Sequence, residues 1–296
     1  MGLRMDENIH YLKTFIPLLV GLFFIVFILL EAALPLRKRT RPFILRALLN
    51  ICLTGLIFFV GSVVVKPITS GVIDSNATRQ FGLLHVFPLP TFLYYIAGFL
   101  LLDLTFYYWH LINHNIPLLW RFHNMHHVDP DLDVTTSFRF HVVEVTYATG
   151  FRIIQIVFIG ISLPLFLIYE LIFQLSTVFH HSNLRMPIKL ERVINVVFVT
   201  PRMHGIHHSQ IRNETNSNYS VIFRWWDQLH KTLRLNIPQN QINIGVPAYQ
   251  NSGDNTLWHL IAMPFLKQRP YWKSGKGVEN ARNVSMLPPK RGMIVE

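Results

Sequence analysis

The chain has 296 residues, of which 51% are hydrophobic and only 15% carry charge. With a mean hydropathy of +0.32, this composition excludes an ordinary soluble enzyme and predicts an integral membrane protein. Because Cys52 is the only cysteine, a disulfide framework and a cysteine-based zinc or iron–sulfur site are excluded, and any metal must be held by nitrogen and oxygen. The net charge of +11 comes from scattered Lys and Arg residues, which indicates cytoplasmic loops and anionic lipid rather than nucleic acid.

Three apolar runs are each close to the roughly 20 residues needed to cross a bilayer. They occupy residues 14–30, 47–65 and about 91–109. The segment 35–46, between the first two runs, contains five positive residues, whereas the N-terminal tail and the 66–90 segment contain two each. By the positive-inside rule, we expect the 35–46 segment to be cytoplasmic and the third span to end at the cytoplasmic face.

A fourth apolar region, residues 145–179, lies between two groups of histidines. Its uncharged core, residues 153–169, is long enough for one span, but a single crossing would put the two groups on opposite faces, about 30 Å apart. If the groups act together, the region must enter the membrane and return. Gly160, Ser162 and Pro164 interrupt its middle, as such a turn requires. We therefore expect two helices of about 16 residues, which reach part or barely all of the way across.

The expected architecture is an all-α integral membrane protein with about three spans and a re-entrant or short two-helix hairpin. A histidine-rich helical cap is expected at the cytoplasmic face. We divide the chain into N-terminal membrane spans (1–90), a di-metal domain (91–235) and a C-terminal cytoplasmic tail (236–296). The tail has little periodicity and predicts loop, a short helix and a frayed basic end.

Eleven of the 15 histidines fall between positions 110 and 208, and their spacings repeat. One H-x3-H pair and two H-x2-H-H groups place imidazoles three or four residues apart on one face of a helix, where they can bind one ion or two adjacent ions. Four ligands saturate a zinc ion, so eight histidines at these spacings suit two metals. The eight are His110, His114, His123, His126, His127, His204, His207 and His208. The isolated histidines are expected to be surface or interfacial side chains; they are His10, His85, His230 and His259.

These motifs are surrounded by the segments LLWRFHNMHHVDPDLDVTTSFRFHVVE, HHSN and NYSVIFRWWDQLHKT. With them, the chain resembles the fatty acid hydroxylase superfamily, also called the sterol desaturase family, over about residues 99–233. The resemblance implies a membrane-embedded oxygenase in which histidines bind two Fe ions that activate O2 against a C–H bond of a lipid. Carried over residue by residue, it implies that the eight histidines are metal ligands and that His181 is a ninth.

Two positions depart from the family pattern. Ser220 stands where family members often have glycine, and Val142 stands where the motif usually reads RFHP. Both departures concern loop geometry more than iron. The short acidic connection DPDLDVTTS is similar to that of bacterial members, which implies an inner membrane location. The positive-inside rule predicts that the active site is on the cytoplasmic face.

Three residues near the motifs are candidates for catalytic or supporting roles. Asp103 lies seven residues before His110 on the same helical face, where a carboxylate is suited to orient an imidazole N–H. The alternative role for Asp103 is a hydrogen bond to a neighbouring helix. His141 and Glu144, both in the segment RFHVVE, complete this set, and His141 is weighed equally as a metal ligand and as a residue behind the ligands.

The helix that ends at ELIFQLSTVFHH distinguishes two adjacent histidines. His181 continues a stripe that also contains Glu170, Gln174 and Thr177, so it is expected to face the metals. His180 points about 100° away and is expected to support the site, as a further candidate for a catalytic role, without binding metal. Glu170 lies about 16 Å back along the helix and is expected to line the lipid cavity.

The expected reaction is hydroxylation of an alkyl carbon, with desaturation as a close alternative that the sequence does not separate. A membrane zinc-dependent hydrolase would need a general-base carboxylate such as that of H-E-x-x-H, which this sequence lacks. A metal-binding transporter would place its ligands in mid-bilayer rather than at span ends. The expected partners are a membrane lipid substrate, O2 and a separate electron-donor protein, because no haem- or flavin-binding domain is evident; no nucleic acid is expected.

Overall fold

The computed structural model describes residues 2–275, 277–282 and 292–295, and this part of the chain contains helices, loops and isolated β-bridges but no strands. Its long helices are α1 (Gly2–Ala33), α2 (Phe43–Val60), α3 (Lys66–Arg79), α5 (Thr91–Asn115), α7 (Val142–Ile159) and α8 (Leu163–His181). A π-helical segment, Gly61–Val65, joins α2 to α3. Five segments are long and apolar enough to cross a membrane: Thr14–Ala33, Phe43–Val65, Thr91–Asn115, Val142–Ile159 and Leu163–His181. The chain is therefore an integral membrane protein.

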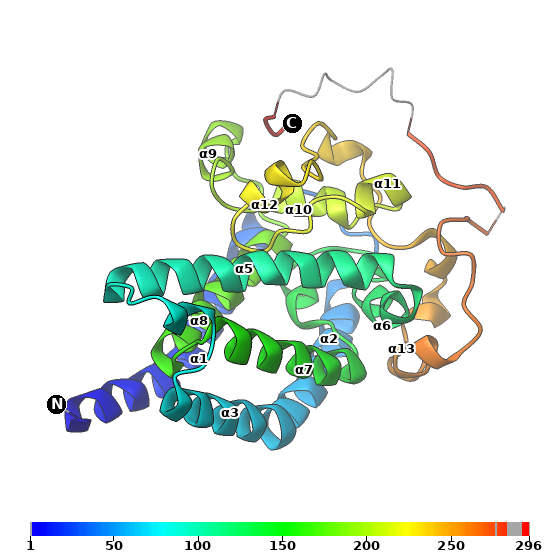
Figure 1. Ribbon diagram of the computed structural model, residues 1–296. Coiled ribbons are helices and arrows are strands. Elements are labelled where there is room, and N and C mark those ends of the chain that lie inside the picture. Colours follow the sequence, from blue (N-terminus) through cyan, green and yellow to red (C-terminus); the bar gives the residue numbers. More distant parts are fainter. Residues whose placement is uncertain (1, 276, 283–291, 296) are drawn as a thin grey trace.

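The remaining helices are short. They are α4 (Leu83–Val86), α6 (Pro117–His127), α9 (Ile188–Ile194), α10 (Pro201–His207), α11 (Arg212–Thr215), α12 (Trp225–Leu229) and α13 (Leu257–Ala262). Five 3-10 segments accompany them: Val134–Phe138, Gln239–Gln241, Pro247–Tyr249, Ser252–Asn255 and Met263–Phe265. In Figure 1, α9 to α12 gather on one side of α5, whereas α3 and α7 lie on its other side.

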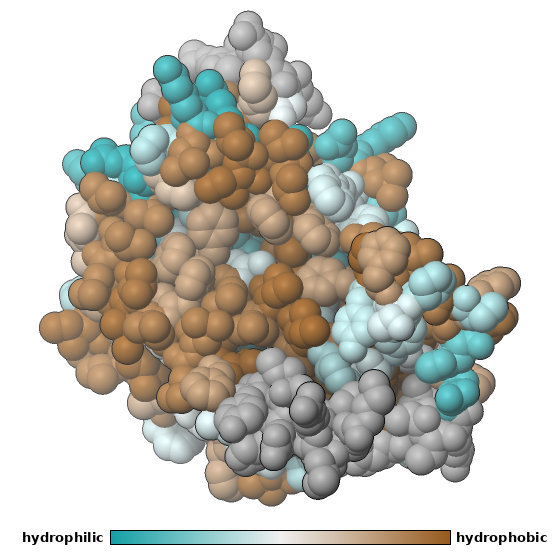
Figure 2. All heavy atoms as spheres, turned by 90° about the vertical axis from the view of Figure 1, so that its left-hand side faces the viewer, coloured by the Kyte–Doolittle hydropathy of each residue, from teal (hydrophilic) through white to brown (hydrophobic). Residues whose placement is uncertain are grey.

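The long helices present large apolar side chains on their outer surfaces. Leu22 of α1, Phe58 of α2 and Phe92 of α5 are each 60% exposed or more. Figure 2 shows a broad brown surface on the face that lies at the left of Figure 1. An apolar surface of this extent requires a lipid environment.

A proline turn brings α6 back toward the end of α5. Pro117 occupies the first turn of α6, where its missing N–H costs no helical hydrogen bond. Because a residue before proline avoids the helical region, Ile116 is extended, with φ −92° and ψ 116°, and α5 ends there. The turn places His123 and His127 of α6 beside His110 and His114 of α5.

A tight turn at Gly160 joins α7 and α8 into the expected hairpin. Gly160 has φ +85°, and a Cβ on it would lie 2.7 Å from Cδ2 of His85, so only glycine fits. The Tyr94 hydroxyl donates to the Gly160 carbonyl at 2.9 Å and accepts from the Ser162 N–H at 2.8 Å. The hairpin carries His181 and the segment before α7 back to the same end of the bundle.

The hairpin helices contain 18 and 19 residues, more than the expected 16 or so, and both qualify as candidate spans. The expectation was too short because it took the apolar region, residues 145–179, as the extent of the hairpin, whereas α7 begins at Val142 and α8 ends at His181. The charges that bound the uncharged core lie inside the two helices. In the structure those charges, Arg152 of α7 and Glu170 of α8, form an ion pair at 2.9 Å. Paired charges are tolerated inside a membrane segment, so both helices continue through them.

A buried polar network fastens the loop between α1 and α2 to the acidic segment after α6. Arg46 forms an ion pair with Asp129 at 2.8 Å, and the Asn50 amide donates to the same carboxylate at 3.1 Å. Burial alone would raise the pKa of the Asp129 carboxyl, but Arg46 and Arg139 outweigh it and hold that pKa below its usual value. The backbone N–H groups of Thr40 and Arg41 donate to the Asp131 carboxylate. The positive loop and the histidine helices therefore share one end of the bundle.

The segment after Gly245 forms loops, 3-10 turns and the short helix α13, as expected, but it is also packed against the core. Val246, Tyr249, Leu260 and Met263 join a buried cluster with Leu53 of α2 and with Trp120 and Met125 of α6. The expected frayed basic end falls largely on residues 283–291, which lie outside the described residues.

Candidate metal centre

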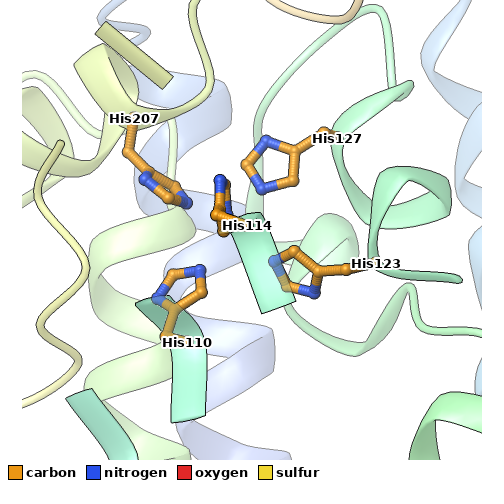
Figure 3. Close-up of side chains that lie close together, drawn as sticks. All are labelled: His110, His114, His123, His127 and His207. Atoms are coloured by element: carbon orange, nitrogen blue, oxygen red, sulfur yellow. The ribbon is translucent and has the colours of Figure 1, made fainter. Parts of the chain in front are cut away.

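Nine buried or nearly buried histidines converge where the ends of α5, α6, α8 and α10 meet, and they form two groups. The five-histidine group contains His110, His114, His123, His127 and His207, and the four-histidine group contains His126, His181, His204 and His208. Within each group, one nitrogen of every ring lies within 4.8 Å of the corresponding nitrogen of every other. Figure 3 shows the rings of the five-histidine group pointing toward one another. These nine residues are the nine that the sequence singled out.

Each H-x2-H-H motif contributes to both groups. His123 and His127, four residues apart on α6, belong to the five-histidine group, whereas His126 belongs to the other. The second motif is divided in the opposite sense, because His204 and His208 belong to the four-histidine group. Residues at i and i+4 share a helical face and the intervening residue points aside, so one motif can serve two adjacent ions. The rings of His127 and His208 stack between the groups, with centroids 4.4 Å apart.

Four of the rings are oriented by backbone carbonyls. Nδ1 of His110 lies 2.7 Å from the Tyr219 carbonyl oxygen, and Nδ1 of His207 lies 2.7 Å from that of Ser217. In the four-histidine group, Nδ1 of His126 lies 3.2 Å from the Arg139 carbonyl oxygen, and Nδ1 of His181 lies 2.8 Å from that of Thr177. A carbonyl oxygen only accepts, so each Nδ1 carries the proton and each neutral ring presents the lone pair of Nε2 to its group.

The four-histidine group brings these lone pairs into direct opposition. Nε2 of His181 lies 3.1 Å from Nε2 of His126 and 3.0 Å from Nε2 of His204, and Nε2 of His208 lies 3.1 Å from that of His204. His126 and His181 hold their protons on Nδ1, so their contact joins two lone pairs and cannot be a hydrogen bond. Two imidazoles bound at right angles to one ion at about 2.1 Å would be about 3.0 Å apart. The residues fit a metal ion.

The five-histidine group leaves several nitrogens unsatisfied. Nε2 of His123, His127 and His207 and both ring nitrogens of His114 are buried without a hydrogen-bond partner in the part of the chain that the structure describes. Buried polar atoms are rarely left unpaired, and a bound cation would satisfy them. The Glu144 carboxylate lies 2.7 Å from Nδ1 of His123 and orients that ring.

The histidines outside the membrane segments are poor bases in this setting. Burial lowers the pKa of His204, His208, His126 and His127 well below its usual value, and it lowers the pKa of His207 to about 3. Neighbouring imidazoles contribute in the same direction for His204 and His208. The rings are therefore neutral and available as metal ligands near neutral pH.

A turn at residues 217–220 supplies two of the orienting carbonyls, a role that the sequence did not reveal. Asn218 has φ +56°, and its amide donates to the carbonyls of Met203 and Arg234. The Asp227 carboxylate accepts from the N–H groups of Tyr219 at 2.8 Å and Ser220 at 2.9 Å. The available signal was the pair of polar segments NETNSNYS and WWDQLHKT, since Asn tolerates positive φ and a buried Asp binds N–H groups.

Asp103 does not contact an imidazole, contrary to the first expectation. Its carboxylate accepts from Nε1 of Trp226 at 2.7 Å and from the N–H of Phe223 at 3.2 Å. The alternative, a hydrogen bond to a neighbouring helix, describes this contact. A spacing of seven residues puts Asp103 on the same face as His110 but about 10 Å along the axis, which is too far for contact. The carboxylate that does orient an imidazole is Glu144.

His141 and His180 lie outside both groups. His141 caps α7, because its Nδ1 accepts from the Val143 N–H at 3.1 Å while its Nε2 contacts the Ile261 carbonyl oxygen at 3.0 Å. With both nitrogens engaged, His141 has no lone pair to offer a metal. Nδ1 of His180 contacts the Val221 carbonyl oxygen at 3.1 Å, and the centroid of its ring lies 4.2 Å from that of the His204 ring. His180 lies beside the four-histidine group and lines the same cavity, but it is not one of the rings that could hold an ion.

A cavity of about 950 Å³ extends from the histidines between α1, α2 and α8. His110 and His123 of the five-histidine group and His126, His181 and His204 of the four-histidine group line it at one end. Side chains from α1 and from the π-helical segment line its other end, among them Pro17 and Val65. The polar stripe of α8 faces the cavity with Glu170, Gln174 and Thr177. The volume and mostly apolar lining suit a lipid-sized ligand.

Comparison with known proteins adds family evidence to this geometry. Residues 95–232 match the family described as fatty acid hydroxylase. The matched region contains the eight histidines of the spaced motifs together with His180 and His181. No solved structure matches the chain significantly.

Several named proteins are similar to this chain. Ornithine lipid hydroxylase OlsE of Rhizobium tropici is 29% identical over 173 residues, which cover 58% of this chain and 50% of that protein. Cholesterol 25-hydroxylase of Rattus norvegicus is 26% identical over 54% of this chain and 53% of its own length. Alkylglycerol monooxygenase of Homo sapiens is 26% identical over 46% of this chain and 29% of its own length. The chain thus spans about half the length of these relatives, or less.

Proposed function

Because residues 95–232 of this chain match the fatty acid hydroxylase family, we propose that the protein is a membrane-bound di-iron oxygenase that hydroxylates a C–H bond of a lipid. The observation that carries the proposal is the close approach of the Nε2 atoms in the four-histidine group, 3.0–3.1 Å apart in three pairs, of which His126 and His181 oppose two lone pairs. The five-histidine group beside it provides a second position. When bound, two Fe ions would supply the activation of O2.

The chain's own residues would hold and orient this centre. The nine histidines of the two groups are the proposed ligands. The Glu144 carboxylate and the carbonyls of Ser217 and Tyr219 fix the rings of the five-histidine group, and the carbonyls of Arg139 and Thr177 fix rings of the other. Partners of this kind raise the basicity of a ligating imidazole and prevent its rotation. Asp103 acts at a distance, by holding Trp226 and Phe223 in the segment that follows the 217–220 turn.

The cavity supports a lipid as the substrate. Apolar side chains of α1, α2 and α8, such as Phe24, Phe58 and Phe173, border the path to the histidines and would exclude water from an alkyl chain. The three similar proteins named above are described as acting on lipids or sterols, which favours this substrate class. His180 lines the cavity next to His204, where it is placed to contact the reacting part of the substrate.

The test combines metal analysis with product analysis. Protein purified without air should hold about two Fe ions per chain. Lipids from a deletion strain and a complemented strain should differ by one oxygen atom in one lipid class, and product formation should require O2 and a separate reductant protein. Loss of two hydrogens in place of oxygen gain would identify desaturation. One tightly bound zinc ion, with activity that needs neither O2 nor reductant, would identify the hydrolase alternative and contradict the proposal.

The proposed location is a bacterial inner membrane, with the metal centre on the cytoplasmic face. The positive 35–46 loop supports this orientation, since Arg46 pairs with Asp129 close to the histidines. A reporter enzyme that works only in the cytoplasm should be active when it is fused to the C-terminus. A periplasmic signal would reverse the orientation.

A further inference from the structure

Glu170 places a carboxylate in the wall of the cavity. Its side chain lines the cavity and is 25% exposed, and one of its oxygens lies 2.9 Å from Nη2 of Arg152. The Arg152 side chain is only 13% exposed and does not line the cavity, so the anionic member of the pair faces the ligand space. A charge inside a membrane segment is costly, and such residues commonly serve a substrate.

The carboxylate is held in a fixed position through Arg152. Nη1 of Arg152 donates to the Gln155 side chain at 2.9 Å. The guanidinium also lies over the rings of Phe106, Tyr169 and Phe173, 5.2–5.5 Å from their centroids. Hydrogen bonding and ring contacts together restrict the guanidinium, and the ion pair restricts Glu170 in turn. An acceptor fixed in this way loses little conformational entropy when a ligand binds.

The position of Glu170 along α8 defines a distance from the metal centre. Glu170 lies eleven residues before His181 on a continuous helix, which corresponds to about 16 Å along its axis. Gln174 and Thr177 lie between them on the same stripe, and the Thr177 hydroxyl already donates to the Phe173 carbonyl oxygen. Glu170 is therefore the charged acceptor that a ligand reaching the histidines along α8 would meet at this depth.

We infer that Glu170 is a specificity-determining residue that accepts a hydrogen bond from a hydroxyl or ammonium group of the lipid and thereby selects the carbon presented to the histidines. The inference rests on the proposed lipid oxidation. A carboxylate accepts hydrogen bonds but does not donate them, and its charge repels the anionic headgroup of a free fatty acid. The substrate class is a lipid whose hydrogen-bond donor is separated by an apolar segment of about 16 Å from the carbon that reacts.

Ligand binding tests this inference without turnover. Radiolabelled 1-hexadecanol would be bound to the purified full chain in nanodiscs and competed with hexadecyl methyl ether or hexadecanoate. The ether has the same alkyl chain as the alcohol but lacks the O–H donor. The wild-type protein should bind the alcohol about tenfold more tightly than either competitor, because a hydrogen bond to a charged acceptor contributes roughly this much.

The double variant Arg152→Met/Glu170→Leu removes both charges and leaves no buried charge unpaired, so it should fold. It should bind the alcohol and the ether equally, with its affinity for the ether unchanged. Glu170→Gln, which keeps a neutral acceptor, should lose several-fold of the preference. Gln174→Leu, one helical turn away on the same stripe, is the matched control and should keep it. A tenfold preference for the alcohol that persists in the double variant would overturn the inference.

The same samples separate this inference from the proposed function. Metal content and O2-dependent product formation test the proposed oxidation, whereas the alcohol-to-ether ratio tests Glu170 alone. A protein that holds two Fe ions and oxidises lipid but shows no preference for the alcohol contradicts only the inference. A protein that prefers the alcohol but forms no oxidised product contradicts only the proposed function.

Discussion

The two histidine groups are oriented by different means. In the four-histidine group, the orienting acceptors are backbone carbonyls, and that of Thr177 belongs to α8 itself, the helix that carries His181. In the five-histidine group, one acceptor is the Glu144 side chain and two are carbonyls of a turn that the Asp227 side chain holds. The first arrangement uses main-chain acceptors, whereas the second depends on particular side chains. Substitutions around the ligands should therefore affect the five-histidine group more.

The largest effect is expected from a ligand in the four-histidine group. His181→Ala removes one of four nitrogens that lie within 4.8 Å of one another, so Fe content should fall by about half and product formation by more than about 100-fold. His180→Ala is the matched control, because His180 is adjacent in sequence but lies outside the group, and it should retain most of the metal. Metal analysis of both purified variants decides the matter. Equal loss, or loss only in His180→Ala, would show that the assignment of the two rings is wrong.

Glu144→Gln should produce the next largest effect, and only in the five-histidine group. The amide has a similar shape but removes the charge that polarises the N–H of His123, so metal affinity at this position should fall about 10- to 100-fold. Titration with a chelator should show one metal ion bound with lower affinity and the other bound as in the wild-type protein. Glu214→Gln is the control, since Glu214 is a buried carboxylate that pairs with Arg282 and contacts no histidine. Weakening of both metal ions by Glu144→Gln would remove the distinction between the groups.

Asp227→Asn should have a smaller effect on the same group. The substitution weakens the hydrogen bonds to the N–H groups of Tyr219 and Ser220, and the free energy of unfolding should fall by about 2 kcal/mol. Affinity for the metal ion of the five-histidine group should fall only a few-fold, because the Ser217 and Tyr219 carbonyls remain. Thermal unfolding and chelator titration measure the two quantities. A loss larger than that of Glu144→Gln would indicate that Asp227 acts more directly.

Thr177→Ala should leave metal binding unchanged. The bond to His181 comes from the Thr177 carbonyl, which the substitution keeps, and α8 tolerates alanine well. Chelator titration should match that of the wild-type protein. A lower metal affinity in this variant would show that side chains orient the rings of the four-histidine group as well.

The sequence was informative wherever the relevant contacts are local. Eight of the nine histidines stand at helical spacing, since residues three and four apart share a face whatever the rest of the fold does, and the ninth, His181, came from the family resemblance and helical phase. The turn at Gly160 was expected from the residues around it, and the separate orientations of His180 and His181 followed from helical phase.

Contacts across the fold were not available from spacing. Glu144 meets His123 across 21 residues that include an irregular acidic loop, and Trp226 reaches Asp103 from 123 residues away. The ion pair between Arg152 and Glu170 joins the two hairpin helices and was likewise not available from spacing. Helical periodicity places side chains on a face but does not say which partner covers that face.

The Arg152–Glu170 pair also bears on how the chain enters the bilayer during synthesis. A single charge at the centre of a spanning helix costs about 2.5–3.5 kcal/mol on insertion, so α7 and α8 would each enter less readily alone. The two charges flank one short turn and reach each other only when both helices are present. The translocation machinery should therefore release α7 and α8 into lipid together, as one preassembled unit. Glycosylation-site mapping of truncated nascent chains should find α7 poorly inserted until α8 has been made.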